Sequence, residues 1–263
     1  MVRCMSQEGH EDEREDRAEE ADFGFRRVPH GAKGRLVREV FDRVALRYDL
    51  MNDLMSGGIH RLWKDAMVEL AAPRAGELLL DVAGGTGDIA LRLLERTRGE
   101  ARVAVCDVSE AMVRRGRDRA LDRGKLAGID WLVGDAEALP IADRSIDAYT
   151  IAFGLRNVTD INAALEEVRR VLKPGGRFFC LEFSRVTVPL LAELYERYSF
   201  ALVPWLGERV TGSREAYQYL VESIRRFPPQ KELAKRIANA GLGLVRFRNF
   251  SGGIAALHSA WRL

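Results

Sequence analysis

Three short stretches of the sequence combine glycine with acidic residues at regular intervals. Segment 81–88 reads DVAGGTGD, and its glycines, starting with Gly84, let the backbone turn sharply and approach a ligand without a Cβ in the way. Asp107 follows twenty residues after the last glycine, the spacing at which an acid accepts hydrogen bonds from the hydroxyls of an adenosine ribose. Segment 134–136, GDA, is placed to hold the adenine amine. Together the three stretches predict a site for an adenosine-containing ligand.

Arg156 and Asn157 offer a second kind of chemistry, because a guanidinium can stabilise a phenolate and a carboxamide can orient an oxygen. Arginine stays protonated at neutral pH, so an electrostatic role for Arg156 is favoured over base catalysis. The alternative is a structural loop arginine paired with an acid such as Asp160.

The segments around these residues alternate between strand-like and helical patterns. Strand-like runs over 77–83, 101–108, 129–134, 146–153 and 177–183 alternate with helical runs over 88–98, 110–123 and 160–172. Such alternation predicts an α/β fold with a parallel sheet and helices on both faces. Ligands of such sheets bind beyond the carboxyl ends of the strands, which is where the residues above fall. Two final runs, 244–250 and 254–261, are joined by SGG and predict a hairpin that makes the last strand antiparallel.

The sequence outside this sheet predicts a disordered tail and additional helices. Residues 1–27 carry nine acids and five arginines with few apolar groups, so residues 1–30 are predicted to be disordered. Residues 31–263 then form a single domain. Within it, helical spacing predicts a cap over 31–72 and a helical insertion over 186–240.

The composition excludes several functional classes. Hydrophobic residues make up 47% and charged residues 30% of the 263 residues, as in globular proteins, and a net charge of +2 does not indicate nucleic-acid binding. No run of about 18 uncharged apolar residues predicts a transmembrane helix, and no secretion signal is visible. Three cysteines without a CxxC pair fit a reducing cytoplasm. No cluster of metal ligands is visible in the sequence.

Two narrow motifs identify a resemblance: YDLMND at 48–53 and FGLRNVTD at 153–160. With them the chain resembles the ubiquinone/menaquinone biosynthesis C-methyltransferase family, which belongs to the class I methyltransferases that use S-adenosylmethionine (SAM). Further matches are VFDRVA at 40–45, HR-x-WK at 60–64, DVAGGTGD at 81–88, LKPGG at 172–176, LEFS at 181–184, YL-x-ESI at 219–224 and GIAALH at 253–258. The resemblance extends from about residue 34 to the end of the chain.

The resemblance implies a Rossmann-like fold with a seven-stranded, mostly parallel sheet whose last strand is antiparallel. It implies SAM as the cofactor, with contacts from Thr86, Asp107, Asp135 and Ala136. Tyr48 is expected to close over SAM. The family commonly has a serine where this chain has Ala152, so a side-chain contact there is lost, although a backbone contact can remain.

The implied reaction is methylation of a ring carbon of a polyprenylated benzoquinol or demethylmenaquinol. A deprotonated quinol hydroxyl makes the ring carbon nucleophilic, so the protein must mainly align the reactants, stabilise the phenolate and exclude water. Arg156, Asn157 and Asp49 are the candidate catalytic residues. Asp49 would accept a proton or a hydrogen bond, although a helix-capping role is an equal alternative.

The expected substrate has a lipid tail, so contact with the inner face of a membrane is expected. Segment 189–205, PLLAELYERYSFALVPW, could form a groove for that tail, touch the bilayer, pack in the core or form a homodimer face. Three rival functions remain open: methylation of another small phenol, oxidation with a nicotinamide cofactor, and a non-catalytic assembly role. The dinucleotide-like match from Gly85 to Ala90 supports the second, which otherwise lacks a Tyr-x-x-x-Lys pair.

Overall fold

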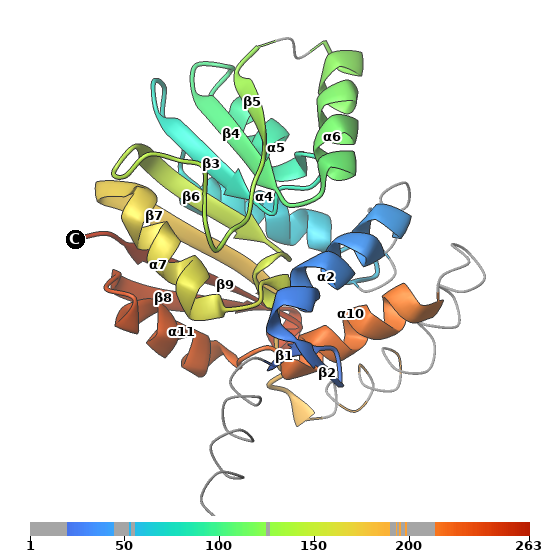
Figure 1. Cartoon of the computed structure of the whole chain (residues 1–263). Helices are drawn as coiled ribbons and strands as arrows, with labels where there is room; N and C mark the ends of the chain where they lie inside the picture. Colours follow the sequence, from blue (N-terminus) through green and yellow to red (C-terminus); the bar gives the residue numbers. More distant parts are fainter. Residues whose placement is uncertain are drawn as a thin grey trace, which may run out of the picture.

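A computed structural model of the chain describes residues 20–44, 53, 56–124, 127–189, 193, 195, 198 and 214–263. Within these residues, seven strands form one sheet in the order β5-β4-β3-β6-β7-β9-β8. Neighbours from β5 to β7 pair in parallel, and β9 is antiparallel to both β7 and β8. The predicted α/β fold with an antiparallel last strand is confirmed (Figure 1). The strands are β3 (Leu78–Val82), β4 (Arg102–Asp107), β5 (Ile129–Val133), β6 (Ile146–Ala152), β7 (Leu172–Phe183), β8 (Gly243–Phe250) and β9 (Ala255–Trp261).

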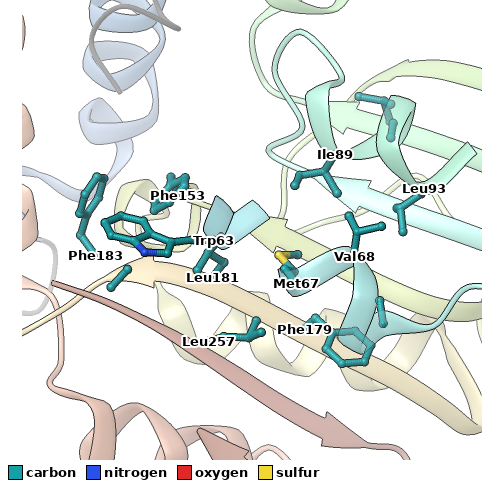
Figure 2. Packing of buried hydrophobic residues seen from close by; sticks show 14 of the residues in the cluster. Trp63, Met67, Val68, Ile89, Leu93, Phe153, Phe179, Leu181, Phe183 and Leu257 are labelled. Carbon is teal, nitrogen blue, oxygen red and sulfur yellow. The ribbon is translucent and has the colours of Figure 1, made fainter. Parts of the chain in front are cut away.

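Helices cover both faces of this sheet, and each face has its own hydrophobic cluster. Leu79 and Leu80 of β3 belong to different clusters, because successive side chains of a strand point to opposite faces. Figure 2 shows the first cluster, where Trp63 of the helix over 60–71 lies beside Phe153 and Phe183. The helices are α2 (His30–Val44), α4 (His60–Ala71), α5 (Asp88–Arg96), α6 (Glu110–Asp122), α7 (Ile161–Val171), α10 (Arg214–Arg226) and α11 (Gln230–Asn239).

The prediction of disorder over residues 1–30 is wrong for residues 20–29. Strands β1 (Glu20–Phe23) and β2 (Arg26–Pro29) pair antiparallel as the β1–β2 hairpin. Figure 1 shows this blue hairpin beside the orange helix α10. The hairpin is ordered because Phe23 is 3% exposed and stacks on Tyr219, with ring centroids 4.4 Å apart. An average over an acidic segment hides one buried aromatic anchor of this kind.

The strand β7 begins earlier than the sequence predicts. The segment containing Gly175 and Gly176 was expected to separate a helix from a strand starting at residue 177, but β7 already includes both glycines. The backbone of Arg262 pairs with this segment, because Gly175 donates to its carbonyl and its own N–H donates to Gly176. The Arg262 guanidinium donates to the carbonyls of Arg169 and Leu172 at the end of α7, which satisfies groups that a helix end leaves unpaired.

The predicted helical cap over 31–72 corresponds to α2 and α4. The segment 189–205 lies almost entirely outside the described residues. Among the residues that the structure describes, no helix is both long and apolar enough to cross a bilayer.

Candidate active site

A pocket opens at the carboxyl ends of the parallel strands, where the sequence predicts the ligand. Asp107, Asp135 and Ala136 line it together with Asn157. Helix α2 covers it from the other side through three residues, Gly34, Val37 and Phe41. The predicted cofactor side and one predicted catalytic residue therefore share a single pocket.

The glycine loop after β3 leaves no room for a larger residue at Gly84. A Cβ on Gly84 would lie 2.8 Å from Asp81 Oδ2 and 2.8 Å from Val105 Cγ1. The next residue, Gly85, has a φ of +55°, which an L side chain rarely adopts. The loop is therefore compact enough for a ligand to approach its backbone.

The Asp107 carboxylate is held by two backbone donors. Gly85 N donates to Oδ2 over 2.8 Å, and Ser109 N donates to Oδ1 over 2.9 Å. Burial raises the pKa of Asp107, and these two hydrogen bonds oppose the rise. Each carboxylate oxygen keeps a second lone pair, so Asp107 can still accept from a pair of ribose hydroxyls. The Ser109 hydroxyl also donates to Asp42 of α2 over 2.6 Å, which ties the covering helix to this strand end.

A second carboxylate, Asp81, lies buried below the glycine loop. Its Oδ1 accepts from the Thr150 hydroxyl over 2.9 Å, while its Oδ2 is buried without a partner among the described residues. Burial raises the pKa of Asp81 to about 7. A small hollow is lined by Asp81, Gly84, Thr86 and Lys64. An unpartnered acceptor in a polar hollow is a place for a donor from a ligand.

The Lys64 ammonium sits in that hollow and pairs with Asp88 over 3.0 Å. Burial by itself raises the pKa of Asp88, but Lys64 and Arg92 outweigh it and lower the pKa to about 2. Sequence reasoning did not single out Asp81 or Lys64 as site residues. Both residues lie in the matched motifs HR-x-WK and DVAGGTGD, but only the fold brings them to the same hollow.

Arg156 is buried, and its partner is not the one the sequence suggested. Its Nη1 donates to Glu182 Oε1 over 2.7 Å and to the Phe153 carbonyl. The suggested partner, Asp160, instead caps α7 by accepting from Asn162 N over 2.7 Å. Burial raises the pKa of Glu182, and the Arg156 guanidinium opposes that rise.

Only one of the two terminal nitrogens of Arg156 is used in these contacts. Nε and Nη2 are buried and have no hydrogen-bond partner within the described ranges. A buried donor left unsatisfied costs about 1–3 kcal/mol. This edge of the guanidinium is therefore free to bind an acceptor atom that the described residues do not provide.

Asn157 follows in the same short 3-10 helix, η2 (Leu155–Asn157). Its Oδ1 accepts from the Tyr219 hydroxyl over 3.1 Å, and its Nδ2 lies 3.5 Å from the Phe153 carbonyl. Phe153 also packs against Phe183, with ring centroids 4.7 Å apart, and Figure 2 shows both rings next to Trp63.

The remaining predicted cofactor residues are placed as follows. Thr86 is buried and its hydroxyl accepts from Arg119 over 3.2 Å. Asp135 is exposed and its Oδ1 accepts from Glu137 N over 2.9 Å. Tyr48 and Asp49 lie outside the described residues. No group of metal-ligating side chains occurs in the part of the chain that the structure describes.

The two buried histidines of the described chain have structural partners. His60 Nδ1 lies 3.0 Å from the Ser56 hydroxyl, and burial lowers the pKa of His60 to about 4. His258 Nε2 lies 3.0 Å from the Gln230 carbonyl, and burial lowers its pKa as well. Neither geometry points to a base at the Arg156 loop.

Comparison with known proteins decides the family. The model of the ubiE/COQ5 methyltransferase family matches residues 30–262. The chain belongs to this family. The relatives named Ubiquinone/menaquinone biosynthesis C-methyltransferase UbiE include one from Paracoccus denitrificans, 59% identical over 94% of this chain and 99% of that protein. Another, from Acidiphilium cryptum, is 56% identical over 94% of this chain and 98% of its own.

Solved structures share the fold of this ubiE/COQ5 family member at low sequence identity. A SAM-dependent methyltransferase from Aquifex aeolicus is 18% identical, has a TM-score of 0.54 and covers 76% of this chain and 89% of its own. The [4+2]-cyclase SpnF is 18% identical, with a TM-score of 0.57 over 87% and 96% of the two chains. At this identity the likeness shows the class I methyltransferase fold alone.

The residues present fit the SAM that this family uses. Asp107 offers unused lone pairs at the pocket, and the glycine loop excludes side chains where a ligand would approach. The unpartnered Asp81 Oδ2 lies beside the loop and suits the ammonium of an amino-acid group. SAM is accordingly the cofactor of this family member.

Proposed function

We propose that the chain transfers a methyl group from SAM to a ring carbon of a polyprenylated quinol, either a benzoquinol or demethylmenaquinol, in ubiquinone/menaquinone biosynthesis. The observation that carries this proposal is the unpartnered, buried edge of Arg156. Its neighbour in the chain, Asn157, lines the cofactor pocket. The names of the relatives, with identities of 56–59% over nearly their full length, support the same reaction.

The strand-end residues bind the cofactor in this proposal. Asp107 would hold the ribose hydroxyls, the backbone of the Gly84 loop would lie against the cofactor, and Asp135 and Ala136 would hold the adenine. Asp81 would accept from the amino group. SAM, when bound, supplies a methyl group on a sulfonium, and the ring carbon that accepts this group then loses its proton.

Arg156 would stabilise the oxyanion of the acceptor ring. Its Nε and Nη2 form one edge of a planar fork that suits a single oxygen or a pair of oxygens. The site is buried, so this interaction is stronger than it would be in water. Glu182 pairs with the guanidinium over 2.7 Å, and arginine stays protonated at neutral pH, which favours electrostatic stabilisation over proton abstraction.

Asn157 would orient the acceptor, because it lies next to Arg156 and lines the cofactor pocket. The packed rings of Phe153 and Phe183 would exclude water from this side of the loop. Tyr48 and Asp49 complete the proposed site on the strength of the sequence motif alone. The tail of such a quinol is apolar, so we also propose that the chain meets its substrate at a membrane surface.

The experiment that tests the function is methyl transfer from isotope-labelled SAM to reduced demethylmenaquinol and to a polyprenyl methoxybenzoquinol, with product mass spectrometry. The expected product gains one methyl group on a ring carbon. A methyl group found on oxygen, or transfer to neither quinol by a protein that binds SAM, would contradict the proposal and favour another phenolic acceptor.

Arg156→Lys is the matched variant, because it keeps the charge beside Glu182 but removes the Nε/Nη2 edge. We expect kcat to fall about 100-fold, with the SAM dissociation constant within about twofold of the wild type, because Arg156 does not line the cofactor pocket.

A further inference from the structure

The hydroxyl of Tyr219 sets the orientation of the Asn157 carboxamide. It donates to Asn157 Oδ1 over 3.1 Å. Burial raises the pKa of Tyr219 above its usual value, so the phenol keeps its proton and remains a donor. A carboxamide whose oxygen accepts this bond must present its nitrogen on the opposite side. The Tyr219 hydroxyl therefore selects one of the two orientations of a residue that lines the cofactor pocket.

Tyr219 is itself held by the β1–β2 hairpin. The rings of Phe23 and Tyr219 stack at 23°, with centroids 4.4 Å apart. Phe23 is 3% exposed and Tyr219 is 5% exposed. Stacking over a ring that is also buried restricts the side chain to one rotamer, because neither χ1 nor χ2 can change without opening the contact.

The turn of the hairpin is locked to the same helix one turn further along. Phe25 N donates to Glu222 Oε2 over 2.9 Å, and Gln218 Nε2 donates to Glu222 Oε1 over 2.8 Å. Gly24 has a φ of +62°, and a Cβ there would lie 2.3 Å from Glu222 Oε2. The close approach of turn and helix keeps Phe23 in register with Tyr219.

We propose that the β1–β2 hairpin is a positioning element of the methyl-transfer site, which fixes Asn157 through Tyr219. This inference rests on the proposed function, in which Asn157 orients the acceptor. It assigns a role to the YL-x-ESI motif, whose tyrosine contacts both Phe23 of the hairpin and Asn157. Tyr219 acts through Asn157 and is a positioning residue.

The first test compares Tyr219→Phe with Tyr149→Phe in the full chain. Tyr219→Phe keeps the ring and its stacking but removes the donor. Tyr149 is a matched control, because it is 1% exposed and packs its ring against Phe178 within β6 and β7. We expect kcat to fall about tenfold in Tyr219→Phe, as the loss of one positioned hydrogen bond implies, with KM for SAM changed less than about twofold. Tyr149→Phe should leave kcat within about twofold.

A second comparison separates positioning from general packing. In an Asn157→Ala background, Tyr219→Phe should cause no further loss of kcat, because the residue through which it acts is gone. Phe23→Leu keeps an apolar side chain without the stack and should lower kcat about threefold. Equal losses in Tyr219→Phe and Tyr149→Phe, or a full additional loss in the Asn157→Ala background, would overturn the proposal.

A third readout does not need the acceptor. The side-chain amide signals of Asn157, assigned by their absence in Asn157→Ala, should move in the ¹⁵N spectrum of Tyr219→Phe and stay in place in Tyr149→Phe. Unchanged signals in both variants would overturn the positioning role. Failure of the wild type to methylate either quinol would overturn the proposed function alone, because the amide signals still report on the contact.

Discussion

The Asp107 carboxylate in the cofactor half of the site and the Asn157 carboxamide in the other half are held by contacts of different range along the chain. In the cofactor half, Asp107 accepts from Gly85 and Ser109, which are 22 and 2 residues away. In the half around Asn157, the Tyr219 bond spans 62 residues and the bond from Phe25 to Glu222 spans 197. The first half is set by consecutive strand ends. The second forms only when distant elements pack together.

The halves also differ in how they hold a buried polar group. The Asp107 carboxylate is held by neutral backbone donors, whereas the Arg156 guanidinium is held by the opposite charge of Glu182. Loss of one hydrogen bond from a neutral donor costs about 1–3 kcal/mol. A buried charge that loses its partner is expensive, so the two halves should respond to substitution in different ways.

The largest effect is expected for Glu182→Gln, which leaves the Arg156 guanidinium buried without its counter-charge. We expect the free energy of unfolding to fall by about 3–5 kcal/mol, measured by urea denaturation. The double variant Arg156→Met, Glu182→Leu should recover most of this loss. If Glu182→Gln and the double variant are equally destabilised, Arg156 and Glu182 stabilise the fold through packing and not through charge. The proposed difference between the two halves would then be wrong.

In the cofactor half, Asp107→Asn is expected to weaken binding and spare the fold. Loss of the charge-assisted hydrogen bonds to two hydroxyls should lower the affinity for S-adenosylhomocysteine about 100-fold, as measured by titration calorimetry. Asp135→Asn is the control, since Asp135 is exposed and should lose far less affinity. A large fall in melting temperature for Asp107→Asn without ligand would show that this carboxylate is structural.

Acid should weaken the ion pair between Lys64 and Asp88 below the glycine loop. The pKa of Asp88 is about 2 in the folded chain and about 3.9 when unfolded, so the unfolded state binds more protons between these values. The stabilisation of about 2 kcal/mol that this lowered pKa provides is complete above pH 4 and is lost as the pH falls towards 2. Lys64→Met should flatten the fall of stability over this range. An unchanged slope would mean that Lys64 does not lower the pKa of Asp88.

The smallest effect is expected at the hairpin turn, where Gly24→Ala tests the long-range half. The positive φ should cost about 1 kcal/mol, and the approach to Glu222 should add about as much. Gly99→Ala is the control, since Gly99 has a φ of +81° and no neighbour within 4 Å of a Cβ. Thermal unfolding of the two variants isolates the clash. Equal losses of stability in Gly24→Ala and Gly99→Ala would show that the contact with Glu222 adds no cost.

Sequence alone could predict the half that depends on neighbouring strands. The spacing from the glycine loop to Asp107 and to Asp135 follows from parallel strands whose ends meet at one edge. The partner of Arg156 could not be predicted in this way. Glu182 lies in β7, and it reaches Arg156 only because β6 and β7 pair with Thr150 opposite Phe179. Neither strand's own sequence specifies this register. The hairpin at residues 20–29 was missed because composition averages conceal a single buried phenylalanine.

The separation of 197 residues between the hairpin turn and Glu222 also sets an order of events during synthesis. A ribosome adds about 5–20 residues each second, so the turn waits roughly 10–40 s before its partner helix has been made. The strands that carry Asp107 and Asp135 can pair during this interval. The cofactor half should therefore form on the nascent chain first, and the half around Asn157 only when translation is almost complete.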